Sequence, residues 1–181
     1  MDKKISYKIR TKFDPNEILI EGLICRMKLY NSKNEEIAET IFDIQHIKKI
    51  GALKWYLCKT GYATNLKTRK RMHQLILPCP RGVEVDHKDR NKLNNKRNNL
   101  RYASKSQQGQ NRGPNRNSQS GIKGVWELPN GKWSSQITCN KKRYVLGDFL
   151  TKEEAAQAYN EKALLLFGKF ASVNKEGGHN E

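Results

Sequence analysis

The stretch from Val83 to Asn111 constrains the fold of this 181-residue chain more than any other part of it. A short apolar run leads into an adjacent acid and imidazole, Asp86 and His87, and a polar loop rich in asparagine follows. The segment Leu100 to Ala103 is short and β-prone, and Ser104 after it can cap a brief polar helix. The stretch therefore predicts a strand, a loop, a second strand and a helix.

This order of elements can bring oxygen ligands together on one hard cation. Asp86 supplies an anionic ligand, and an amide from the following helix can add a neutral oxygen. Carboxylate, carbonyl and water ligands suit Mg²⁺ or Mn²⁺ rather than zinc. His87, the next residue along the strand, points to the opposite face and is available for proton transfer, with an unperturbed pKa of about 6.5. A metal, a base and basic surroundings together predict hydrolysis of a phosphodiester.

Three segments of this stretch resemble the HNH endonucleases found in phages. They are Val85 to His87, Asn91 to Asn95 and Asn98 to Arg101. The resemblance implies that Asp86 holds one divalent metal ion, that His87 is the general base, and that Asn99 braces the loop and orients the histidine. It also implies the ββα-metal fold, which is also called the His-Me finger.

The resemblance places a further metal ligand in the predicted helix, at Gln108. The family generally has asparagine or histidine there, so the glutamine is a departure. Asn111 lies one helical turn further on and is the alternative ligand. Upstream, the resemblance extends through a segment that holds His73 among apolar residues, and we interpret His73 as structural support for the site.

The composition favours a polyanionic partner. The chain has 35 Lys and Arg against 18 Asp and Glu, a formal net charge of +17, which is typical of proteins that bind nucleic acid. Residues 1–13 lack the apolar core of a secretory signal, and no segment approaches the roughly 20 apolar residues of a membrane span. We therefore expect double-stranded DNA as the partner, no membrane and no small-molecule cofactor. We also expect a cytoplasmic protein in the bacterial host cell of a phage or mobile element; no oligomeric state follows from the sequence.

The four cysteines form no CxxC pair, so they give no zinc-ribbon signal. Cys58, His73 and Cys79 are spaced too irregularly for a typical zinc site. Free thiols are the expectation.

Residues 1–66 predict a small α+β unit that forms the N-terminal part of a nuclease domain. Residues 23–30 alternate as a strand does, and residues 41–44 predict a second short strand. Isoleucines from Ile44 to Ile50 then recur at helical spacing, and residues 55–64 predict a hairpin.

Residues 67–111 would form the nuclease core itself, and they begin with a basic run. This run, residues 67–71, is either a solvated face or a strip that contacts phosphates. Arg69 and Arg71 are its candidate DNA contacts.

A polar stretch separates this core from the rest of the chain. Residues 109–120 contain no apolar side chain and predict a flexible linker at 112–120 with a domain boundary inside it. Arg112 and Arg116 either enter a minor groove or belong to a plain tether.

Residues 121–174 predict a three-stranded antiparallel sheet packed on one helix, and 175–181 a tail. The strand candidates are 121–126, 132–138 and 143–149. Thr151, with Glu153 and Glu154 in the first turn, predicts the start of the helix, and Gly168 its end.

This C-terminal segment is similar to the AP2 DNA-binding domain. The similarity rests on residues 124–125, Trp133, 146–149, 151–159 and 167–174. It implies that the sheet lies in the major groove, and alternation along the strands agrees, because it presents one polar, basic face. The positions that match DNA contacts are Lys123, Trp126, Lys132, Gln136, Thr138 and Arg143.

Together the patterns predict an α+β endonuclease of two parts, similar to homing endonucleases. A ββα-metal nuclease with one Mg²⁺ or Mn²⁺ ion would cut DNA near a site that the AP2-like domain locates. The alternative is a DNA-binding regulator with a degenerate HNH fold, and the departure at Gln108 is the feature that favours it.

Overall fold

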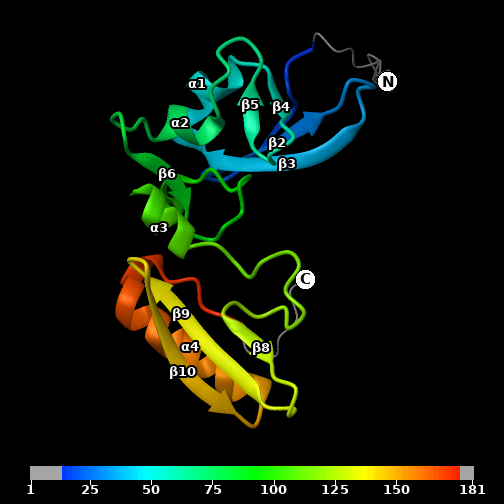
Figure 1. The fold of residues 1–181 in the computed structure, drawn as a ribbon. Helices are drawn as coiled ribbons and strands as arrows, with labels where there is room; N and C mark the ends of the chain where they lie inside the picture. The colour runs from blue at the N-terminus through cyan, green and yellow to red at the C-terminus, as the bar shows by residue number, and fades with distance from the viewer. Residues whose placement is uncertain (1–13, 176–181) are drawn as a thin grey trace, which may run out of the picture. The chain divides into compact units, whose positions relative to one another are not determined.

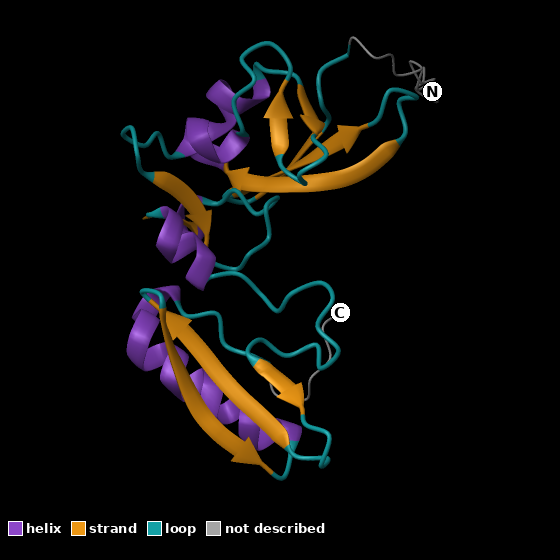
Figure 2. Ribbon diagram, viewed as in Figure 1, coloured by secondary structure: helices purple, strands orange, loops and turns teal. Residues whose placement is uncertain are grey.

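The structure, a computed structural model, describes residues 14–175. The N-terminal stretch 1–13 and nearly all of the tail expected at 175–181 lie outside the described residues. The chain divides into two units, Met1–Tyr102 and Ala103–Glu181, which are called the first and the second unit below. Each mixes helices with small antiparallel sheets (Figures 1 and 2), so the predicted α+β class is confirmed.

The first unit begins with an antiparallel meander in the order β1-β2-β3. Its strands are β1 (Ile18–Glu21), β2 (Ile24–Tyr30) and β3 (Glu36–Asp43). Alternation along β2 buries Cys25, Met27 and Leu29 completely, as the sequence pattern predicted. The predicted strand at 41–44 is the end of the longer β3, whose first half is mostly exposed and shows no apolar alternation; β1 was not predicted.

A helical turn and a hairpin pack on this meander. The elements are η1 (Ile44–His46), α1 (Ile47–Gly51), β4 (Trp55–Leu57), β5 (Ala63–Asn65) and α2 (Met72–Ile76). The indole of Trp55 is buried and its Nε1 donates to the carbonyl oxygen of Ile50 at 2.8 Å. The helical spacing and the hairpin predicted for this region are both confirmed.

The motif-bearing strands complete the same core. They are β6 (Glu84–His87) and β7 (Leu100–Ala103), with η2 (Arg97–Asn99) before β7. Val85 and Leu100 are buried in one hydrophobic cluster with Trp55 and Met72. Each fully buried side chain of this size contributes roughly 1.5–3 kcal/mol, so the early meander and the motif strands stabilise each other.

The second unit contains a sheet in the order β10-β9-β8 with one long helix packed on it. Its elements are α3 (Lys105–Gln110), β8 (Val125–Glu127), β9 (Trp133–Cys139), β10 (Lys142–Phe149), α4 (Lys152–Phe167) and η3 (Gly168–Phe170). Ser104 and Thr151 cap the starts of α3 and α4, as predicted, and each forms a capping box. The predicted sheet packed on one helix is therefore confirmed.

Two boundaries in this unit differ from expectation. The strand predicted at 121–126 begins only at Val125, because Gly121 and Gly124 adopt φ of +67° and +75°, which a strand does not allow. The chain also divides earlier than the predicted linker at 112–120, between Tyr102 and Ala103. Within that predicted linker Ser120 is buried, and its Oγ donates to the carbonyl oxygen of Val125 at 2.6 Å. The other domain limits stay predictions.

Gly124 should be intolerant of any side chain. A Cβ built there would lie 2.4 Å from the ring of Tyr159 and 2.5 Å from the carbonyl oxygen of Gln136. Gly131 has a nearly identical φ of +76° but nothing within 4 Å of its Cβ position, so it is a matched control. We expect Gly131→Ala to lower the free energy of unfolding of the second unit by about 1 kcal/mol, from backbone strain alone. Gly124→Ala should lower it by roughly 2–5 kcal/mol, because overpacking adds to the strain.

Urea denaturation of the full chain and of both variants would measure this difference. Equal losses for the two alanine variants would show that the sheet and α4 relax around the new methyl group.

Candidate functional site

His87 ends β6 with its side chain buried against the interior of the first unit. Asp86, one residue earlier, is only partly buried, so the alternation predicted along this strand is present. His87 was predicted to be available for proton transfer, but one of its ring nitrogens is engaged: Nε2 lies 3.2 Å from Oδ1 of Asn95. That amide was not among the predicted site residues.

A short chain of hydrogen bonds assigns the proton on the His87 ring. The hydroxyl of Thr40 on β3 donates to the carbonyl oxygen of Leu93 at 2.8 Å, so its oxygen accepts from Nδ2 of Asn95, also at 2.8 Å. The amide oxygen of Asn95 therefore faces His87 and needs a donor. Nε2 carries the hydrogen in the neutral ring, and the lone pair lies on Nδ1.

Two further rings pack against His87. His73, in α2, meets it edge to face with 5.0 Å between ring centroids, and Tyr62 lies 5.1 Å from His73 and 5.9 Å from His87. The guanidinium of Arg71 and the ammonium of Lys92 lie over the Tyr62 ring, 4.3 and 5.0 Å from its centroid. The structure thus places the predicted support residue against the predicted base, and adds a tyrosine that carries two cations.

Burial keeps both imidazoles neutral. Burial, helped by the neighbouring His87 and Arg71, lowers the pKa of His73 to about 3. Burial also lowers the pKa of His87; its hydrogen bond to Asn95 and the charges of Asp89 and Asp86 raise it, but by less. A neutral His87 at neutral pH is in the protonation state that a general base requires.

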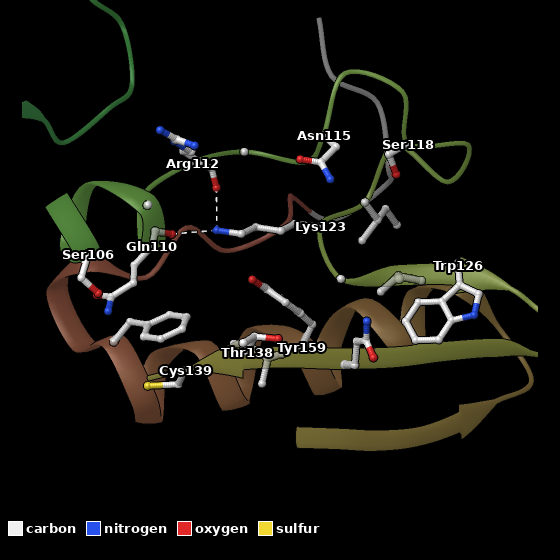
Figure 3. A pocket seen from close by; sticks show the side chains of 18 of the residues that line it. Ser106, Gln110, Arg112, Asn115, Ser118, Lys123, Trp126, Thr138, Cys139 and Tyr159 are labelled. Carbon is white, nitrogen blue, oxygen red and sulfur yellow. Dashed lines mark hydrogen bonds between the residues drawn. The ribbon is translucent and has the colours of Figure 1, made fainter. Parts of the chain in front are cut away.

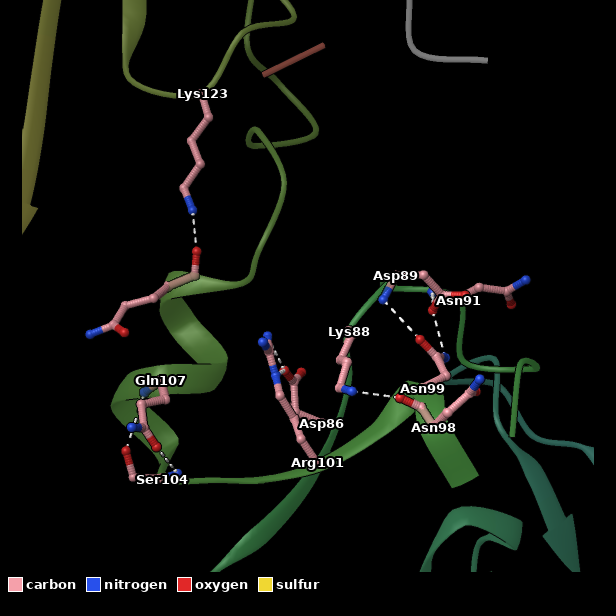
Figure 4. A network of polar contacts seen from close by, with 11 residues as sticks. Asp86, Lys88, Asp89, Asn91, Asn98, Asn99, Arg101, Ser104, Gln107 and Lys123 are labelled. Atoms are coloured by element: carbon pink, nitrogen blue, oxygen red, sulfur yellow. Dashed lines mark hydrogen bonds and ion pairs between the residues drawn. The ribbon is translucent and has the colours of Figure 1, made fainter. Parts of the chain in front are cut away.

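Asn99 holds the loop between β6 and β7 (Figure 4). Its Nδ2 donates to Oδ1 of Asp89 and to the carbonyl oxygen of Asn94, both at 2.8 Å. Its own Oδ1 accepts from the backbone N of Asp89 at 3.2 Å, and its carbonyl oxygen from the backbone N of Lys88 at 2.9 Å. These bonds brace the loop; the amide that hydrogen-bonds His87 is that of Asn95.

Asp86 forms an ion pair with Arg101 on the neighbouring strand β7. The predicted amide ligands belong to the second unit, where Gln108 is half-buried in α3 and Asn111 is buried at the end of that helix. Among residues 14–175, no cluster of three or more His, Cys, Asp or Glu side chains could hold a metal. A single carboxylate with water still fits Mg²⁺ or Mn²⁺, because Mg²⁺ keeps several of its own waters.

Four of the six positions predicted to contact DNA on the sheet share its face away from α4. Ser134, Gln136 and Thr138 alternate along β9 and therefore share one face of the sheet. Strand pairing adds Arg143, which lies opposite Thr138, and Trp126, which lies opposite Ser134. The other face of β9, with Ile137, packs on α4. Thr138 and Arg143 are exposed and Trp126 is 38% exposed, so polar and aromatic groups gather on this face.

Lys123 lies beside that face with its ammonium already engaged. Its Nζ donates to the carbonyl oxygens of Gln110 and Arg112, at 2.7 and 2.6 Å. A cavity of about 600 Å³ in the second unit is lined by the sheet on one side and by the segment 106–118 on the other (Figure 3). The predicted linker therefore borders the predicted DNA face.

The remaining predicted contacts occupy exposed loops or helix ends. Arg69, Arg112, Arg116 and Lys132 are exposed, and Arg71 precedes α2 with its guanidinium over Tyr62. No helix within residues 14–175 combines the length and the apolar character that a membrane crossing requires.

Comparisons with known proteins show which family the chain resembles. A family model described as HNH endonuclease matches residues 78–110. A mimivirus protein, the uncharacterized HNH endonuclease L560 of Acanthamoeba polyphaga mimivirus, is 35% identical over 133 residues, which cover 70% of this chain and 69% of that protein. No solved structure matches the chain.

Plant transcription factors match a smaller part of the chain. The ethylene-responsive transcription factor ERN1 of Medicago truncatula is 46% identical over 67 residues, 35% of this chain and 25% of that protein. The AP2/ERF and B3 domain-containing protein Os01g0141000 of Oryza sativa subsp. japonica is 44% identical over 55 residues, 30% of this chain and 15% of that protein. The chain therefore spans a quarter or less of these two relatives.

The two buried imidazoles should make the fold sensitive to mild acid. In the unfolded chain His73 binds a proton near pH 6.5, but in the fold its pKa is about 3, so the unfolded state binds more protons between these values. The free energy of unfolding should therefore fall as the pH falls below 6.5, by up to about 1.4 kcal/mol per pH unit for each such histidine.

Replacing His73 by phenylalanine keeps a ring in place and removes its titration. Urea denaturation between pH 5 and 8 should show a shallower loss of stability for His73→Phe than for the wild type. His46→Asn, at a half-exposed histidine, is the control and should change the slope less. A His73→Phe slope identical to that of the wild type would contradict the neutral, buried state of His73.

Proposed function

The chain belongs to the HNH endonuclease family, and from that premise we propose that it hydrolyses phosphodiester bonds of double-stranded DNA near a site that its second unit locates. The observation that carries the proposal is the state of His87. It directly follows a carboxylate, it is buried and neutral, and Asn95 directs its lone pair to Nδ1.

In the proposed reaction His87 takes a proton from the attacking water through Nδ1. The amide of Asn95, braced by the hydroxyl of Thr40, accepts the hydrogen of Nε2 and keeps the ring from rotating. Asn99 acts on His87 only indirectly, because it fixes the loop that carries Asn95. Correct positioning of the base affects the rate strongly, because proton transfer by a well-placed base accelerates a reaction by roughly 10²–10⁴-fold.

Asp86 would hold the Mg²⁺ or Mn²⁺ ion together with water, and Gln108 and Asn111 stay the alternative amide ligands that the sequence predicts. When bound, the ion would polarise the scissile phosphate and stabilise the leaving 3′ oxygen. Arg71 and Lys92 bring positive charge to the ring cluster around His87, which favours an approaching phosphate.

The second unit would bind DNA as an AP2-like domain, through the face that carries Trp126, Gln136, Thr138 and Arg143. The partial matches to plant AP2/ERF proteins support this role. A specific duplex interface buries about 600–1,000 Å² or more of protein surface. The segment 106–118 borders the cavity beside the sheet, so it would either move or join the DNA interface through Arg112 and Arg116 when a duplex binds.

The HNH endonuclease L560 comes from a mimivirus and not from a phage. The similarity to phage homing enzymes in particular therefore stays a prediction. A regulator with a degenerate nuclease site is the second candidate, because Gln108 stands where the family generally has asparagine or histidine.

Removal of the base should separate cleavage from binding. We expect His87→Ala to slow Mg²⁺- or Mn²⁺-dependent cleavage of duplex DNA by roughly 10²-fold or more, while DNA affinity in EDTA stays within twofold. His46→Ala, at the half-exposed end of η1, is the matched control and should cleave like the wild type. The wild-type rate should fall with acidity only below pH 6.5, because burial lowers the pKa of His87.

Cleavage by His87→Ala at the wild-type rate would remove His87 from the mechanism. DNA binding without cleavage by the wild type under any divalent ion would favour the regulator.

The sheet face should account for part of the salt dependence of binding. Each phosphate contact of a cationic side chain adds about 0.9 to the slope of log K against log salt concentration. Arg143→Ala, on the proposed DNA face, should lower that slope by about 1. Lys162→Ala removes the same charge from α4, where the ammonium lies over the Tyr144 ring, and should leave the slope unchanged. Equal effects of the two substitutions in a filter-binding or fluorescence assay would show that the sheet face is not the contact surface.

A further inference from the structure

Arg101 has no part in the mechanism above, yet it contacts the carboxylate on which that mechanism depends. Its Nε lies 2.8 Å and its Nη2 2.7 Å from the same oxygen, Oδ2 of Asp86 (Figure 4). The two side chains are only 12% and 11% exposed. Both come from the paired strands β6 and β7, whose backbones hold the two groups together.

This ion pair gives Asp86 a counter-ion that belongs to the protein. At this depth the pair is only weakly screened by salt, and removing one partner would leave a buried charge uncompensated. In the chain by itself, Arg101 therefore occupies the electrostatic position of a cation at Asp86.

A divalent ion at Asp86 would meet that positive charge. The ion and the guanidinium together carry three positive charges, against one negative charge on the carboxylate of Asp86 itself. Within residues 14–175 no cluster of three or more acidic, His or Cys side chains supplies a further set of ligands. Magnesium sites of this kind are commonly completed by substrate phosphates. A phosphate supplies the missing negative charge, and a guanidinium that leaves Oδ2 can bind it through two parallel hydrogen bonds.

We propose that Arg101 competes with the divalent ion for Asp86, so that the ion binds tightly only together with DNA phosphate. The inference rests on the proposed function, because it takes Asp86 as the metal-holding carboxylate. Arg101 thereby couples metal binding to substrate binding and limits the occupied state to the DNA complex.

The test measures Mn²⁺ binding rather than cleavage. Mn²⁺ is titrated into the full chain by electron paramagnetic resonance, with and without a 30-base-pair duplex, in a His87→Ala background that spares the DNA. Without DNA, Arg101→Gln should bind Mn²⁺ at least tenfold more tightly than the parent. The duplex should tighten Mn²⁺ binding at least tenfold in the parent and less than threefold in Arg101→Gln.

Arg26→Gln is the matched control. It removes the same charge from the same unit, at an exposed pair with Glu21 and Glu39 on the meander, and should leave Mn²⁺ binding unchanged. Arg101→Lys keeps the charge but loses the contact of two nitrogens with Oδ2 of Asp86. This variant replaces Arg101→Gln in the experiment if Arg101→Gln does not fold. Its Mn²⁺ binding without DNA should be about threefold tighter than that of the parent.

Unchanged or weaker Mn²⁺ binding in folded Arg101→Gln or Arg101→Lys overturns the inference, because Arg101 would then only orient Asp86. If the parent binds no Mn²⁺ even with DNA, the metal site of the proposed function fails, and the inference fails with it.

Discussion

Hydrogen bonds between the β6–β7 loop and strand β3 hold the residues that position His87 in place. The backbone N–H of Ile41 donates to the carbonyl oxygen of Leu93 at 2.9 Å. The backbone N–H of Asn95 donates to the carbonyl oxygen of Ile41 at 2.8 Å. These bonds place Thr40 beneath the side chain of Asn95, and Asn95 in turn holds His87. The N-terminal meander therefore helps to form the site, because its strand β3 hydrogen-bonds the loop that carries Asn95.

Burial explains why this arrangement suits a base. A histidine on an exposed strand would be partly protonated near neutral pH, whereas desolvation lowers the pKa of His87 and of His73 behind it. Protonation of either ring would place a charge inside the core, so the same burial ties the chemistry of the site to the stability of the first unit. Asp86 faces a different environment, in which Arg101 compensates its charge.

The second unit meets a different constraint, the close approach of α4 to its sheet. Tyr159 packs so tightly on Gly124 that no side chain fits there, and the positive φ of Gly124 delays the start of β8. With one face of β9 committed to α4, the polar side chains of Thr138 and Gln136 necessarily face the other way. The polar face is thus a consequence of the packing on its reverse.

The sequence by itself determined the elements and the chemistry. Alternation revealed β2 and β9, and β10 was the strand candidate at 143–149. Capping residues located the starts of α3 and α4, and the Asp86–His87 pair with its spacing to Asn99 indicated an HNH nuclease. These signals are local, because each depends on residues within a few positions of one another. The α+β class followed from them.

Only the tertiary structure decided which groups meet. Nothing near Asn95 in the sequence distinguishes it from the other asparagines of its loop; its role depends on Thr40, which lies 55 positions earlier. The Arg101–Asp86 pair and the cations over Tyr62 likewise join residues from separate elements. Contacts of this kind leave no periodic pattern in the chain, because they arise from the packing of strands and loops that the sequence separates.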